Sequence, residues 1–199
     1  MIFDAYFALW AFVILMVSTP GPANLLVMSA GAAHGFRATV PFMIGLATGK
    51  LGINILLAFG FGALLLAYPL LNFAMKFISA FYLSYLALRG WNNGAASAKS
   101  DTASVGKPAG FLAGCIVHPM SPKAWLMATL AYSQFIVAFD GMFERYALAP
   151  LSFLVAQIIF HSLWCFGGVM LQRQFGANLL LNRALIILTL AVVAWALLQ

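Results

Sequence analysis

A long apolar run near the start of the chain is interrupted by Thr19-Pro20-Gly21-Pro22-Ala23-Asn24 and resumes at Leu25. Proline removes a backbone hydrogen-bond donor and clashes with the preceding helical turn, while glycine lowers helix propensity. A helix through this stretch should therefore open and leave amides and carbonyls without helical partners. Hydrocarbon cannot satisfy such groups, so broken backbone is tolerated where it is buried in protein or lines a wet cavity. The interruption is consequently a candidate binding site.

A second interruption of the same kind follows about half a chain later. His118-Pro119-Met120-Ser121-Pro122-Lys123 divides another apolar run, and Leu25-Leu26-Val27-Met28 is echoed by Trp125-Leu126-Met127. Two interruptions at matching places predict a chain of two halves, each built around a broken helix.

Composition places both interruptions in a membrane protein. Of the 199 residues, 64% are hydrophobic and 7% are charged, and the mean hydropathy is +1.01, far from the composition of a soluble domain. The net charge of +6 comes from scattered basic residues rather than a basic face with interleaved aromatics, so we expect no nucleic-acid partner. The first residues, Met1-Ile2-Phe3-Asp4, lack the basic region of a signal peptide, and we expect the first segment to be retained.

The apolar segments are long enough to cross a lipid bilayer, which takes about 20 residues per helix. We expect crossings at residues 3–33, 41–67, 70–88, 110–138, 148–171 and 184–199. The only long polar connection, 92–109, separates the third segment from the fourth. The sequence therefore predicts an all-α integral membrane protein of six transmembrane helices. A three-helix half at 1–91 is joined by a cytoplasmic linker at 92–109 to a second half at 110–199, and helices 1 and 4 are broken.

The distribution of lysine and arginine predicts the orientation, because these residues favour cytoplasmic loops. The first, third and fifth connections hold six of them: Arg37, Arg89, Lys99, Lys107, Arg173 and Arg183. The opposite side has only Lys76 and Arg145. Both termini are therefore expected outside. Because each half has three crossings, the halves enter the membrane in opposite senses, which is the inverted repeat of many secondary transporters.

Two lysines within the apolar segments are candidates for substrate contact, because a charge in a bilayer is costly and usually faces an interior or a partner. Lys123 directly follows the second break and could attract a substrate carboxylate. Alternatively, it snorkels to an interface or caps carbonyls freed by Pro119 and Pro122. Lys50, with Asn54 one turn later, could line the same interior or snorkel.

At the first break, the side chain of Asn24 can donate and accept hydrogen bonds. A helix restarting at 23–25 would also aim its positive end into the gap, which suits a carboxylate. The alternative is that the Pro-Gly-Pro sequence only kinks a helix against a neighbour, and the matching second break argues against it. The expected substrate-binding residues are Pro20, Gly21, Pro22, Asn24, Lys50, Pro122 and Lys123.

No Asp or Glu lies inside the six segments, so a cationic substrate would lack a counter-ion and proton coupling cannot use a buried carboxylate. His118 and His161 are the remaining groups that titrate near neutral pH, and they are the coupling candidates. His161 shares a helical stripe with Gln157 and Cys165, a pattern that more often packs helices together. Cys115 and Cys165 lack the paired spacing of a metal or redox site, and we expect no metal and no cofactor.

The first interruption, extended to Leu25-Leu26-Val27 and followed by Gly31, His34-Gly35-Phe36-Arg37 and Gly45, resembles the amino-terminal signature of the lysine exporter (LysE/RhtB) family of amino-acid efflux permeases. Ser121-Pro122-Lys123-Ala124-Trp125-Leu126 resembles that family's Asn-Pro-Lys-Ala-Trp motif. The likeness covers nearly the whole chain. It implies a bacterial inner-membrane exporter of amino acids or close derivatives, driven by the proton gradient. It is also compatible with a homodimer.

Three departures from the family pattern bear on the substrate. Ala23 and Ser121 stand where the family often has Asn, so polar contacts there are expected to differ. Lys50 stands where the family is usually apolar or neutral, and exporters of basic amino acids tend to carry an acid nearby. A neutral or acidic amino acid is therefore favoured.

The sequence supports three other functional hypotheses less well. A carrier of another small solute or of a metal ion would need a ligand cluster at membrane depth, and none has the right spacing. A transmembrane thiol carrier would need a cysteine in each half, whereas both cysteines lie in the second. The chain is not expected to be an enzyme, because no nucleophile, base and orienting group can be placed together.

Overall fold

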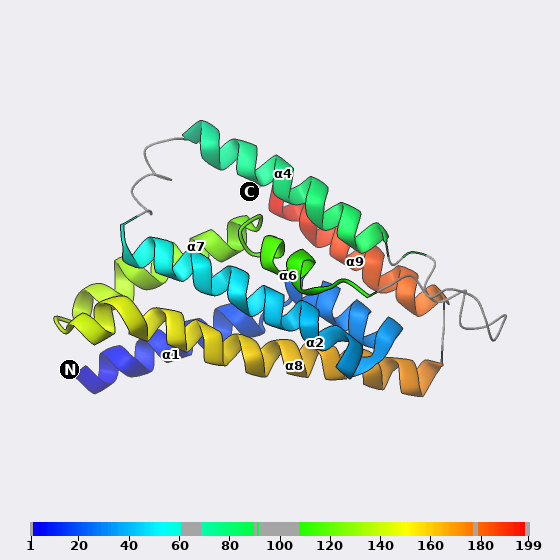
Figure 1. Ribbon diagram of the computed structural model, residues 1–199, viewed down its shortest axis with the longest axis horizontal. Coiled ribbons are helices and arrows are strands. Elements are labelled where there is room, and N and C mark those ends of the chain that lie inside the picture. The colour runs from blue at the N-terminus through cyan, green and yellow to red at the C-terminus, as the bar shows by residue number, and fades with distance from the viewer. Residues whose placement is uncertain (1, 61–68, 90, 92–107, 177–178, 198–199) are drawn as a thin grey trace.

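The fold is described by a computed structural model over residues 2–60, 69–89, 91, 108–176 and 179–197. Within these ranges it contains helices and no strand, which confirms the all-α prediction. The longer helices are α1 (Ile2–Ser18), α2 (Pro22–Ala58), α4 (Pro69–Leu88), α6 (Phe111–Val117), α7 (Pro122–Leu130), α8 (Ala149–Phe175) and α9 (Leu179–Leu197), shown in Figure 1. Short π-helical and 3-10 pieces lie between α7 and α8, at η1 (Ala131–Phe135), η2 (Ile136–Ala138) and η3 (Glu144–Leu148).

Both expected helix breaks are present. α1 ends at Ser18 and α2 begins at Pro22, while α6 ends at Val117 and α7 begins at Pro122. In each case proline is the first residue of the new helix, where its missing N–H costs little because the first helical amides have no partner inside the helix. The prolines thus determine where each helix restarts.

α2 continues through the turn that the sequence predicts at residues 34–37. At Gly35 the backbone leaves the helical region, with φ 79° and ψ 169°. Glycine is nearly the only residue that adopts this conformation readily. α2 therefore consists of two helical pieces that meet at Gly35.

Helices from the two halves of the chain pack against each other. α2 contacts α8 and α6, and α4 contacts α9. In Figure 1, α4 and α9 run in opposite directions, as do the second piece of α2 and α8. Opposite directions are what an inverted repeat requires, but the six crossings and the halves at 1–91 and 110–199 stay predictions. The predicted linker at 92–109 lies outside the described residues except at its last two positions.

Close helix crossings explain several glycines. A Cβ atom on Gly45, Gly49 or Gly114 would overlap a backbone carbonyl oxygen across the α2–α6 contact. A Cβ on Gly31 or Gly168 would do the same across the α2–α8 contact. Small residues let helix backbones approach closely, as is common in membrane proteins.

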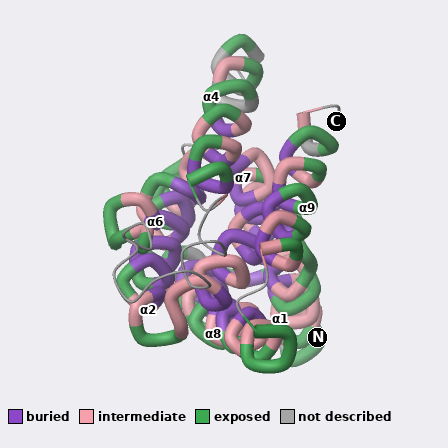
Figure 2. Tube along the Cα trace, turned by 90° about the vertical axis from the view of Figure 1, so that its right-hand side faces the viewer, coloured by how far each residue is buried: buried purple, intermediate pink, exposed green. Residues whose placement is uncertain are grey.

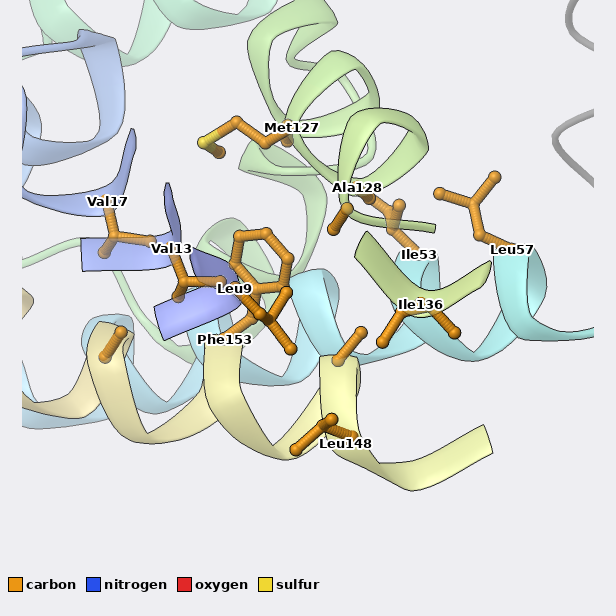
Figure 3. Packing of buried hydrophobic residues seen from close by; sticks show 14 of the residues in the cluster. Leu9, Val13, Val17, Ile53, Leu57, Met127, Ala128, Ile136, Leu148 and Phe153 are labelled. Atoms are coloured by element: carbon orange, nitrogen blue, oxygen red, sulfur yellow. The ribbon is translucent and has the colours of Figure 1, made fainter. Parts of the chain in front are cut away.

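Two hydrophobic clusters form the core. The first surrounds Phe153 of α8 and includes Leu9 and Val13 of α1 and Met127 of α7 (Figure 3). The second joins α2, α4 and α9. Figure 2 shows buried residues where the helices face one another and exposed residues along their outer sides.

The outer sides carry large apolar side chains. Phe7 is 77% exposed and Phe81 is 78% exposed, which suits hydrocarbon better than water. By length and composition, two of the described helices could cross a membrane, Pro22–Ala58 and Tyr146–Phe175. Three apolar helices are shorter: Phe3–Ser18, Phe77–Leu88 and Leu179–Trp195.

The start predicted for the sixth segment is wrong. α9 begins at Leu179, so Asn182 and Arg183 lie within a helix and not in the preceding loop. The Arg183 guanidinium lies 5.2 Å from the ring centroid of Trp91. This cation–π contact stabilises the charged side chain within the helix. The predicted second segment reached residue 67, whereas α2 ends at Ala58 and residues 61–68 lie outside the description.

Candidate functional site

The first break is closed by a side chain from the helix that follows it. Asn24 is buried, and its Nδ2 donates to the carbonyl oxygens of Val17 and Thr19, both at 2.9 Å. The carbonyl of Ser18 accepts a hydrogen bond from Nε1 of Trp164 on α8 at 3.3 Å. Carbonyls freed by the break are thus satisfied. The side-chain amide of Asn24 thus donates to backbone carbonyls of the first break. Its contact with a substrate stays a prediction.

The second break is closed in a similar way. Nε1 of Trp125 donates to the carbonyl oxygen of Pro119 at 2.9 Å. The backbone amide of Ser121 donates to the carbonyl of His118 at 2.9 Å, which turns the chain tightly between α6 and α7. Lys123 follows in the first turn of α7.

Lys123 joins the two breaks. Its Nζ donates to Oγ1 of Thr19 at 2.8 Å, across 104 residues of sequence. A Cβ atom on Gly21 would lie 3.3 Å from the same nitrogen, so the ammonium rests close against the first break. Lys123 is partly exposed, and no carboxylate contacts it among the described residues. We call this meeting of Thr19, Gly21 and Lys123 the junction.

Lys50 lies behind the junction and is fully buried. Its Nζ donates to the carbonyl oxygen of Ala124, the residue after Lys123, at 2.6 Å. It also lies 4.3 Å from the ring centroid of Phe153. A carbonyl oxygen and an aromatic face both present negative charge to the nitrogen. Lys50 therefore does not reach the protein surface, and its partners come from α7 and α8.

Two histidines and a glutamine form a buried group beside the second break. The rings of His118 and His161 stack with centroids 5.8 Å apart and an interplanar angle of 18°. Nε2 of Gln157, one turn before His161 on α8, lies 3.2 Å from Nε2 of His118. The polar stripe predicted on this helix thus faces the second break.

A family model described as LysE type translocator matches residues 13–198. The chain belongs to the LysE type translocator family. This confirms the resemblance noted in the sequence, and the family makes the chain a membrane transport protein. The translocator is 28% identical over 170 residues to the cysteine/O-acetylserine efflux protein of Salmonella choleraesuis (strain SC-B67), which covers 84% of each chain. It is also 28% identical over 193 residues to the protein of that name from Escherichia coli (strain K12), covering 93% of the translocator and 94% of the relative. No solved structure matches it.

The prolines of the expected site shape the translocator's backbone. Pro22 and Pro122 begin helices, and Pro20 is exposed at the first break. None of the three has a polar side chain, so any contact with a substrate would come through neighbouring backbone groups. Their substrate contact stays a prediction, as does the coupling role of His118 and His161.

Sequence reasoning missed several residues of the site. The sequence marks Thr19 only as part of the break, although its hydroxyl is the partner of Lys123. No sequence pattern points to Tyr132, yet its hydroxyl donates to the carbonyl of Asn54 at 2.9 Å. The side-chain amide of Asn54 has no partner in the described part of the chain. No local signal marks Trp164, because its partner lies 146 residues away.

Proposed function

We propose that this LysE type translocator exports a neutral or acidic amino acid, or a close derivative, across the bacterial inner membrane. The observation that carries the proposal is the Lys123 ammonium at the junction, which has the Thr19 hydroxyl as its partner and no carboxylate beside it among the described residues. A carboxylate is a strong hydrogen-bond acceptor for an ammonium group. Family membership supports transport, and relatives named as cysteine/O-acetylserine efflux proteins support an amino-acid substrate.

The substrate carboxylate would replace Thr19 as the partner of Lys123. Both α2 and α7 begin at the junction, since Gly21 precedes the first residue of α2 and Lys123 is the second residue of α7. A helix start carries partial positive charge and unpaired backbone amides. The junction therefore combines one full positive charge with two helix ends of the same sign.

The charges around the junction favour a neutral or acidic side chain on the substrate. Lys50 of α2 places a second basic group near the junction, because its Nζ donates to the carbonyl of Ala124, the residue after Lys123. Among the described acidic residues, Asp140 is exposed and Glu144 accepts a hydrogen bond from Tyr6 at 2.8 Å, and neither contacts Lys50 or Lys123. A cationic side chain would be repelled.

Transport would follow from rocking of the two inverted halves about the junction, driven by the proton gradient. His118 and His161 are the candidates for carrying the proton. The proposal includes six crossings, both termini outside and no resident cofactor, and it allows a homodimer. The alternatives gain nothing from the described residues, where no three of His, Cys, Asp and Glu gather and where Cys115 and Cys165 are free thiols.

The test uses the purified full-length protein in proteoliposomes, with counterflow of labelled L-serine, L-aspartate and L-lysine. We expect serine or aspartate to move faster than in protein-free liposomes and lysine not to. Lys123→Met should slow transport by about 10- to 150-fold, the value of one charge-assisted hydrogen bond of about 1.5–3 kcal/mol. Thr48→Val is the control, because Thr48 is exposed and bonds only its own helix, through the carbonyl of Ile44. Absence of movement for all three amino acids, or full activity of Lys123→Met, would refute the proposal.

A further inference from the structure

A side-chain hydrogen bond links the start of α1 to the segment from η1 to η3 (residues 131–148). The hydroxyl of Tyr6 donates to Oε1 of Glu144 at 2.8 Å, across 138 residues of sequence. The Tyr6 ring also meets the ring of Phe139 edge-on, with centroids 4.7 Å apart, and Phe12 stacks on Phe135 at 4.9 Å. Because α1 belongs to the first predicted half of the chain and the η1–η3 segment to the second, these contacts tie the halves together. We call the Tyr6–Glu144 hydrogen bond the latch.

A packed apolar layer separates the latch from the junction. The latch lies at the end of the bundle where α1 begins (Figure 1). From there Leu9, Val13 and Val17 follow along α1 at one-turn spacing toward the first break, and they are 0%, 0% and 5% exposed. They pack with Phe153 of α8 (Figure 3), whereas Thr19 of the junction is exposed. A solute can pass between this end and the junction only if α1 moves away from its neighbours.

The segment that α1 packs against has an irregular backbone. η1 and η3 are π-helical, η2 is a 3-10 helix, and residues 139–141 lie outside any helix. Single π-helical turns are rare and are frequent at functional sites, and hinges are usually loop or element-terminal residues that absorb changes in backbone angles. A Cβ atom on Gly141 would overlap Oε2 of Glu144, so this glycine leaves room for the carboxylate of the latch. The segment can therefore move apart from α1 without unwinding a long helix.

We propose that the Tyr6–Glu144 latch is a gate, which holds this end of the translocator closed and breaks when α1 separates from the η1–η3 segment during transport. The inference rests on the proposed function, under which this end is the outer one and opens to release the exported amino acid. The junction and the two histidines keep the roles proposed for them.

The reaction rate of a buried thiol measures how often this end opens. Val13→Cys places the thiol in the apolar layer of the full-length protein, and a dilute, charged methanethiosulfonate reagent is added to the purified protein in detergent. Peptide mass spectrometry follows the labelling at position 13 separately from that at Cys115 and Cys165. When labelling is slow relative to closing, its rate follows the population of the open form.

Two variants weaken the latch in different ways. Tyr6→Phe keeps the ring contact but removes the hydroxyl, so labelling should become about 2- to 10-fold faster, which is the effect of one hydrogen bond on the equilibrium between closed and open forms. Gly141→Ala keeps both latch residues and should act in the same direction, because its Cβ displaces the carboxylate. Tyr146→Phe is the control and should leave the rate unchanged, since Tyr146 is exposed and its ring packs against Phe59 at 5.8 Å.

A second measurement asks whether the gate must open for transport. Tyr6→Cys and Glu144→Cys are combined and joined by a bis-methanethiosulfonate reagent, whose links a reductant breaks. Counterflow in proteoliposomes, with the amino acid that the wild type carries, should stop after cross-linking and recover on reduction. The same reagent on Tyr6→Cys alone is the control and should leave counterflow intact.

Two results overturn the inference. An unchanged labelling rate in both Tyr6→Phe and Gly141→Ala would mean that the latch does not hold this end closed. Undiminished counterflow by the cross-linked protein would mean that this end need not open. Labelling requires no transport, so a wild type that carries none of the tested amino acids removes the proposed function, while labelling still decides whether the latch closes this end.

Discussion

Replacing Lys50 with methionine separates the stabilising and functional roles of a fully buried ammonium. The side chain donates to the Ala124 carbonyl at 2.6 Å and lies 4.3 Å from the Phe153 ring centroid. A charged hydrogen bond contributes about 1.5–3 kcal/mol, and a desolvated cation–π contact about 2 kcal/mol. Burying the ion costs several kcal/mol, so an apolar residue of similar length is expected to be neutral or stabilising, by up to about 4 kcal/mol.

Thermal unfolding in detergent measures the stability effect. Lys50→Met should keep or raise the midpoint temperature, at about 2–4 °C per kcal/mol for a chain of this size. Lys50→Ala is the matched variant, because it removes the same charge but leaves a cavity that costs about 2–5 kcal/mol. Its midpoint should therefore fall.

Transport should fall in both variants. For a separation on the order of 10 Å from the bound carboxylate, the lost charge is worth roughly 1.7 kcal/mol at an effective dielectric constant of 20, or about 15- to 20-fold in affinity. Counterflow in proteoliposomes measures this as a rise in the half-saturating substrate concentration. A Lys50→Met protein that is destabilised by more than about 3 kcal/mol would show that the contacts outweigh desolvation. Wild-type transport by that protein would remove Lys50 from the site.

Three other substitutions test the packing and the breaks. Gly168→Ala should lower the unfolding free energy by about 1–3 kcal/mol, because its Cβ would overlap a carbonyl oxygen of α2. Gly52→Ala is the control, because a Cβ there meets open space, and it should be neutral or stabilising in the same detergent assay. Gly21→Ala should raise the half-saturating substrate concentration a few-fold in counterflow without changing the midpoint temperature, because it displaces the flexible end of the Lys123 side chain. Asn24→Ala should lower the unfolding free energy by about 1–3 kcal/mol for each buried carbonyl left unpaired at the first break.

For each of these predictions, one outcome would contradict the reasoning. Equal stability of Gly168→Ala and Gly52→Ala would mean that the α2–α8 crossing is looser than described. A Gly21→Ala protein with unaltered transport would place the substrate away from the junction. If Asn24→Ala keeps its stability but loses transport, the amide binds substrate and is not needed to close the break.

Local sequence was sufficient for the all-helical fold and for both breaks. Proline lacks an amide and fixes its own φ, so Pro22 and Pro122 act on the residues next to them, and helices begin there as expected. The start of α9 could not be found in this way. Asn182 and Arg183 look like loop residues from their polarity, but the Arg183 charge packs on Trp91 from another part of the chain.

By itself, the sequence of this protein determined its apolar composition, its helix breaks, its family and the residue types available at the site. Only the tertiary structure decided which of those residues meet. Lys123 reaches Thr19 across 104 residues, and Lys50 reaches Ala124 across 74. His118 and Gln157 are 39 residues apart in sequence. Helix propensity and apolar periodicity depend on neighbours in the chain, whereas these pairings depend on how whole helices pack, and that is settled by contacts distributed over the entire fold.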